Sequence, residues 1–197
     1  APKLKALLAD NHPARDVARN LFRLARLVEQ ASDDPIPRTE IDMAEQWWKS
    51  ADGKDTAGRR DRARVIKTMA EQALNLTEPV DVSTHPAAPV DALIASGTLR
   101  DLGNDRMTFR HDVLREWAIA NLLSADAARI ESLPFNRPAS ASLVRGVELA
   151  ARMMIEHAAD GVNWHAFLTT LSHDGAHGSW RRAALLALPA QVVDQHL

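Results

Sequence analysis

A histidine at the junction of a predicted strand and a predicted helix is the best-placed residue for chemistry in this 197-residue chain. His111 follows the strand-like stretch Arg106-Met-Thr-Phe-Arg, and the helical stretch Asp-Val-Leu-Arg-Glu-Trp-Ala-Ile-Ala120 follows it. An imidazole at the start of a helix can cap that helix, or it can donate a hydrogen bond to an anion such as a phosphate. The spacing therefore leaves a structural and a ligand-binding interpretation of His111 open.

A second candidate site is a run of basic residues at the start of a predicted helix: Arg59, Arg60, Arg62 and Arg64. Clustered arginines are the electrostatic signature of a DNA-binding winged helix. However, Asp61 interrupts the run, the helix that would enter the DNA groove (90–96) contains Asp91 and no basic residue, and the formal net charge is −2. DNA contact by these arginines is therefore the less favoured interpretation.

Two further sets of titratable side chains are weaker candidates: His157, His165, His173 and His177, and Asp33, Asp34, Glu40 and Asp42. No two of the histidines have the His-x-x-x-His spacing that places two zinc ligands on one helix face, except His173 and His177, which lie in a Gly-containing turn. The four carboxylates flank a helix start, where they compensate the helix dipole. We predict no metal site and no catalytic residue.

Composition limits the class of protein. The chain has no cysteine, which excludes disulfides and thiolate chemistry and fits a reducing compartment. It has no apolar run of the ~20 residues that span a bilayer, and no basic-then-apolar leader opens it. It begins Ala1-Pro-Lys-Leu, without an initiator Met. We expect a piece of a longer cytoplasmic protein with no membrane partner.

Alanine and leucine dominate, and they favour helices. Apolar periodicity, caps and turn residues predict the following elements: a helix from about Pro13 to Val28, a helix after a Thr39–Asp42 capping box, helices over 59–76 and 90–96, a hairpin over 98–109, a helix over 111–123, and shorter helices over 126–133, 140–157, 164–171, 180–188 and from 191 onward. In the helix after His111, Val113, Trp117 and Ala120 are expected to face the core. Gly97 is expected to end its helix in a left-handed conformation.

The order of these elements predicts a mainly α fold in three parts. Residues 1–57 form a helical, lid-like bundle, and residues 58–124 form a winged helix with a short β-hairpin. Residues 125–197 are expected to form HEAT-like helical repeats, because Ser179-Trp-Arg-Arg-Ala-Ala-Leu-Leu-Ala-Leu resembles one helix of such a repeat.

Two segments resemble the STAND signalling ATPases, including their NACHT branch. One is Lys3-Leu-Lys-Ala-Leu-Leu-Ala-Asp10 followed by Val17-Ala-Arg-Asn-Leu-Phe-Arg-Leu-Ala-Arg-Leu-Val28, and the other is Phe109-x-His111 followed by Glu116-Trp-x-x-Ala120. In the family, an Arg-Asn-Pro-Phe sequence lies in the helical lid and its proline packs near adenine. Leu21 stands at that position here. The two segments occur in the order in which the family has its lid and its winged helix.

The resemblance implies a nucleotide switch. In the family, the winged-helix histidine contacts the β-phosphate of ADP and stabilises a closed state, and exchange for ATP opens the molecule and allows oligomerisation. His111 would be that cofactor-binding residue, and ADP or ATP would bind only in the full-length protein. The implied partners are a missing N-terminal NTPase core and a C-terminal sensor region.

The fragment itself is not expected to be an enzyme, because it has no Gly-x-x-x-x-Gly-Lys-[Ser/Thr] sequence to cradle phosphates. Gly53-Lys54-Asp55 lacks the preceding glycine and the following hydroxyl. Two alternatives remain open: a DNA-binding winged-helix regulator and a helical-repeat scaffold for protein interactions.

Overall fold

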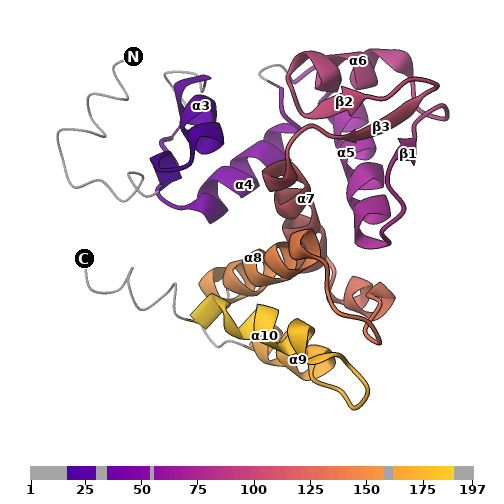
Figure 1. The fold of residues 1–197 in the computed structure, drawn as a ribbon. Coiled ribbons are helices and arrows are strands. Elements are labelled where there is room, and N and C mark those ends of the chain that lie inside the picture. The colour runs from indigo at the N-terminus through magenta and orange to yellow at the C-terminus, as the bar shows by residue number, and fades with distance from the viewer. Residues whose placement is uncertain (1–16, 30–34, 54–55, 158–161, 189–197) are drawn as a thin grey trace.

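The chain folds into a mainly helical structure with one small antiparallel sheet (Figure 1). The computed structural model describes residues 17–29, 35–53, 56–157 and 162–188. The elements of these residues are α3 (Leu21–Glu29), α4 (Glu40–Ser50), α5 (Arg59–Leu74), β1 (Val80–Asp81), α6 (Ala87–Ala95), β2 (Leu99–Asp101), β3 (Arg106–Phe109), α7 (Asp112–Ala125), the 3-10 helix η1 (Ala127–Ser132), α8 (Ala141–His157), α9 (Val162–Leu171) and α10 (Gly178–Leu185). The predicted class, mainly α with a short hairpin, is confirmed. The expected helix start near Pro13 and the expected helix from residue 191 lie outside the described residues.

Helix α4 begins at a reciprocal cap. Thr39 Oγ1 accepts a hydrogen bond from the backbone N–H of Asp42 at 3.1 Å, and Asp42 Oδ2 accepts one from the N–H of Thr39 at 3.0 Å. This is the predicted capping box, with aspartate in the place that glutamate usually takes. At its other end, α4 stops at Ala51, which has a left-handed φ of 49°.

The region predicted as a winged helix contains the sheet. Strand β3 lies between β1 and β2 and pairs antiparallel with both. Leu99 faces Phe109 across the hairpin, and Val80 faces Met107 in the second pair. The predicted hairpin is therefore confirmed. Strand β1 was not predicted, because two residues are too few to show a period-2 pattern.

Helix α6 starts earlier than the sequence predicts. The sequence predicts a helix over 90–96, whereas α6 begins at Ala87. Pro89 is the third helical residue. The first backbone N–H groups of a helix have no acceptor within the helix, so a proline at this position costs no helical hydrogen bond. Gly97 follows the helix with φ of 79°, which confirms the predicted left-handed cap.

The C-terminal helices pack around α8. Helix α8 lies along α7, and α9 and α10 pack against α8 (Figure 1). The predicted helix over 126–133 is the 3-10 helix η1. A succession of repeats stays a prediction, because one stack of three helices does not define a period.

The core is centred on α7. Trp117 is fully buried, Ala120 is also buried, and Val113, which was predicted to face the core, is half-buried. The buried apolar side chains form one continuous cluster with members in α4, α5, α7, α8 and α10. This one core includes residues from all three expected parts, whose boundaries were placed at 57–58 and 124–125. The three-part division therefore stays a prediction.

Candidate functional site around His111

His111 occupies the turn between β3 and α7. Its backbone is extended (φ −133°, ψ 142°) at the N-cap position of α7, yet its side chain makes no capping hydrogen bond to that helix, which the structure describes in full. The residue is exposed. The imidazole nitrogens therefore do not serve the helix start, and the structural interpretation of His111 loses its main support.

An aromatic residue of the lid-like segment lies against His111. The ring centroids of Phe22, on α3, and His111 are 4.7 Å apart, and those of Phe22 and Trp117 are 6.0 Å apart. The guanidinium carbon of Arg26 lies 5.5 Å from the centre of the Phe22 ring. The structure thus brings the described part of the first family-like segment, residues 17–28, against the second segment, whereas Lys3 to Asp10 lie outside the described residues.

The surroundings of His111 lower its pKa below the ordinary value. Partial burial is the main cause, and the positive charges of Arg110 and Arg26 add to it, with a smaller opposite effect from Asp112. The neutral imidazole that results has one N–H donor and one acceptor nitrogen. Such a ring can donate one hydrogen bond to an anion without carrying a charge of its own.

A half-buried aspartate connects α3 to the segment that leads into the sheet. Asp52 follows the end of α4 and pairs with Arg26 of α3 at 2.6 Å, and it also accepts a hydrogen bond from the hydroxyl of Thr98. Thr98 is fully buried at the start of β2. Asp52 therefore fixes the position of α3 relative to the hairpin that leads to His111.

A buried glutamate makes the corresponding connection to the C-terminal helices. Glu40 is the first residue of α4 and 6% exposed. It pairs with Arg23 of α3, accepts a hydrogen bond from Trp117 Nε1 at 3.2 Å, and pairs with Arg145 of α8 at 2.5 Å. The sequence assigned Glu40 to helix-dipole compensation. The sequence could not identify Arg23 and Arg145 as the partners of Glu40, because they lie 17 and 105 residues away from it.

Glu116 lies close to this group of charges on α7. Burial raises its pKa to about 7, the positive charge of Arg145 opposes that rise, and the negative charge of Glu40 adds to it. At neutral pH the carboxyl is therefore part protonated, and it carries less charge than an exposed glutamate would.

The four arginines of the second candidate site do not share one environment. Arg62 is 5% exposed, and it donates hydrogen bonds to the carbonyls of Ala51 and Ala57, both at 3.1 Å. It closes the loop before α5, so it does not belong to a DNA-facing surface. Arg59 and Arg60 are exposed, and Arg64 is exposed but pairs with Asp61 at 2.9 Å.

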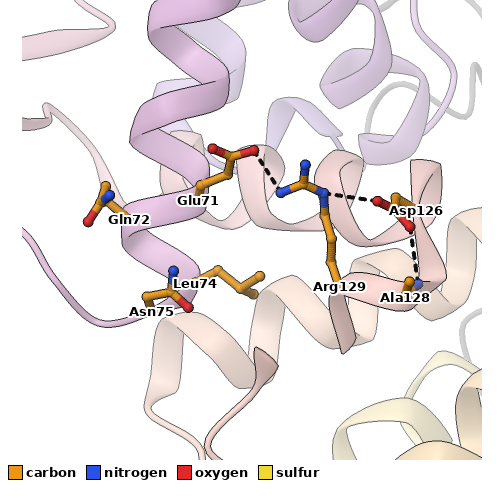
Figure 2. Close-up of a pocket in the computed structure, with 7 residues that line it drawn as sticks. All are labelled: Glu71, Gln72, Leu74, Asn75, Asp126, Ala128 and Arg129. Atoms are coloured by element: carbon orange, nitrogen blue, oxygen red, sulfur yellow. Dashed lines mark hydrogen bonds and ion pairs between the residues drawn. The ribbon is translucent and has the colours of Figure 1, made fainter. Parts of the chain in front are cut away.

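A surface depression of about 510 Å³ lies elsewhere, between the end of α5 and η1 (Figure 2). Arg129 points into it and pairs with Glu71 at 2.7 Å and with Asp126 at 3.2 Å. Two carboxylates thus already contact its guanidinium. Sequence reasoning missed this depression, because its lining comes from two separate segments with no shared motif.

The remaining histidines are dispersed. His157 pairs with Glu45 at 2.8 Å, the ring of His173 lies 4.9 Å from that of Phe135, and Nδ1 of His177 lies 3.0 Å from Ser179 Oγ. Among the described residues, no group of three or more histidine, aspartate or glutamate side chains is arranged to hold a metal ion. In the same residues, no helix has the length and apolarity needed to cross a membrane.

Comparisons with family models, with characterised proteins and with solved structures found no match to this chain.

Proposed function

We propose that this chain is the regulatory region of a STAND-type nucleotide switch, in which His111 contacts the phosphates of a bound nucleotide. The proposal includes a nucleotide-binding core in the same parent protein, a C-terminal sensor, and oligomerisation when the switch opens. In the parent protein ADP or ATP would be the ligand, and no catalytic role is assigned to this region.

One observation carries the proposal. Phe22 and His111 lie in contact, at 4.7 Å between ring centroids, although they belong to the two separate segments that resemble the lid and the winged helix of the family. A nucleotide held between those two elements would contact both. Leu21, which precedes Phe22, is 84% exposed and offers apolar surface of the kind that an adenine ring packs against.

The chemistry of the site suits phosphate recognition in a two-state element. His111 is exposed, its imidazole makes no capping hydrogen bond, and partial burial and nearby arginines lower its pKa. A single hydrogen bond to one phosphate shifts the equilibrium between a closed and an open state only by the difference in its free energy between the two states. The N–H of His111 would supply such a difference if it donated a hydrogen bond to ADP in one state and not in the other.

The test is the nucleotide content of the parent protein. We expect about one nucleotide per chain to be released when the purified parent is denatured, and less from His111→Ala. His165→Ala, which alters another exposed histidine, is the control and should retain the nucleotide. A parent gene without a Walker motif, or a parent protein without nucleotide, would contradict the proposal.

A second candidate is duplex DNA binding, which the exposure of Arg59, Arg60 and Arg64 favours. It predicts salt-sensitive binding that is lost in the Arg60→Ala, Arg64→Ala double variant. The exposed pair Arg181 and Arg182 on α10 is the matched control. The third alternative, a helical-repeat scaffold, predicts that His111→Ala changes neither nucleotide nor DNA binding.

A further inference from the structure

Helix α3 has little burial of its own. It lies at the edge of the molecule (Figure 1), and of its nine residues, all of which the structure describes, only Leu27 is buried. Leu21 is 84% and Val28 48% exposed. Segments with few buried apolar contacts open locally at a small free-energy cost, well below that of global unfolding. An isolated helix of this length is also marginal in water.

Among the residues that the structure describes, two ion pairs join α3 to the rest of the fold. Arg23 pairs with Glu40, and Arg26 pairs with Asp52 at 2.6 Å and, through its other terminal nitrogen, at 3.3 Å. The carboxylate side chains are 6% and 9% exposed, and the arginine side chains 17% and 16% exposed. Ion pairs with this degree of burial are more costly to break from one side than surface pairs, because a buried charge is left without its partner.

The carboxylates belong to the body of the protein and not to α3. Glu40 is also bound by Trp117 of α7 and Arg145 of α8, and Asp52 is also bound by Thr98, the residue before β2. None of these additional contacts involves a residue of α3. Helix α3 therefore docks on two acceptors that the rest of the fold already positions.

The third attachment is aromatic. Phe22 lies against His111 and Trp117, with ring-centroid distances of 4.7 and 6.0 Å. Trp117 is fully buried in the presence of α3. Departure of α3 would remove the Phe22 ring from both.

We propose that α3 is a releasable strap, that Glu40 and Asp52 are the positioning residues which keep it docked, and that its release frees the ring of His111 and uncovers Trp117. The strap is a property of this chain alone. The identity of the ligand that His111 then gains or loses rests on the proposed function.

Hydrogen exchange of the full chain, followed by mass spectrometry, tests the strap. Peptides that cover α3 are compared with peptides that cover α5 in the wild type, in Arg23→Gln and in Arg26→Gln. In each variant we expect exchange in α3 to be faster by about tenfold or more, which corresponds to about 1.4 kcal/mol of local opening. Exchange in α5 should change much less. Arg115→Gln is the matched control, since Arg115 is 18% exposed and pairs with Glu78 at 2.5 Å and with Asp112, neither of which belongs to α3.

The acceptor side gives a second, independent variant. Asp52→Asn should reproduce the effect of Arg26→Gln, and the double variant should exchange no faster in α3 than either single variant, because both remove the same ion pair. This comparison still decides the question if Arg23→Gln does not fold. Additive effects in the double variant would contradict the proposed pairing.

Two results would overturn the strap. In one, α3 exchanges at the rate of α5 in the wild type and in every variant, so that it opens only with the whole fold. In the other, Arg115→Gln accelerates α3 as much as Arg26→Gln does. No nucleotide is needed, so a parent protein without nucleotide would refute the proposed function and leave the strap intact, whereas an unresponsive α3 would refute the strap alone.

Discussion

A histidine at a helix N-terminus that makes no capping bond has its hydrogen-bonding groups available for another partner. His111 is in this position, with its ring tilted by 47° against that of Phe22 and with the charge of Arg26 close enough to lower its pKa. The sequence could identify the residue, because the strand-to-helix junction is visible in local periodicity. It could not identify Phe22 as the neighbour, because nothing in the pattern near residue 22 indicates which distant segment that helix meets.

The pKa of His111 is the first prediction at this scale. We expect it to lie below 6.5 in the folded chain and to rise in Arg26→Gln, which removes an opposing positive charge and loosens α3. A lowered pKa in the docked state means that the stabilisation from the neutral ring is complete above pH 6.5 and is lost as the pH falls through the folded pKa. Proton NMR titration, with the resonance assigned through His111→Gln, measures it. A value at or above 6.5 in the wild type would contradict the described environment.

Glu116 gives a prediction with the opposite pH dependence. Its pKa is raised from 4.5 to about 7, so its contribution to stability is complete below pH 4.5 and is lost as the pH rises through 7. Glu116→Gln should therefore stabilise the chain at pH 8, by an amount on the order of 2 kcal/mol, and should have little effect near pH 4.5. Urea unfolding at the two pH values checks this. Equal effects at both would show that burial of the charge is not the cause.

At the scale of elements, local signals predicted most of the fold. The α4 capping box, the hairpin and the Gly97 cap each depend on residues within a few positions of one another. The ion pairs that join elements could not be predicted in this way. Asp52 lies in a short loop, and its partners are 26 and 46 residues away, so no periodicity or motif connects them.

The contact between α7 and α8 depends on a missing side chain. A Cβ atom at Gly146 would lie 2.5 Å from Cγ2 of Ile119 on α7, closer than real Cβ contacts come. Gly146→Ala should therefore separate the helices and destabilise the chain by about 1–3 kcal/mol, despite the better helix propensity of alanine. Gly178→Ala on α10 is the control, because a Cβ atom at that position would have no other atom within 4 Å and the φ of Gly178 is not left-handed. Denaturant midpoints that shift equally for the two variants would contradict this packing.

At the scale of the whole molecule, α7 connects His111 and the start of α4 to the C-terminal helices. His111 precedes its first turn, Trp117 in its middle reaches Glu40, and its length packs against α8 (Figure 1). His111 and α3 are therefore connected to the C-terminal helices through direct contacts of α7 and Glu40. One continuous core of buried apolar side chains joins these helices.

The central claim is that His111 distinguishes two nucleotide states, and the most direct measurement is the affinity of the parent protein for ADP and for ATP in the wild type and in His111→Ala. A switch requires a difference between the two affinities, and about 1.4 kcal/mol of differential contact corresponds to a tenfold change. We predict that His111→Ala weakens ADP binding by about tenfold or more and changes ATP binding far less, while His165→Ala changes neither. Equal weakening of both nucleotides, or no weakening of either, would contradict the account.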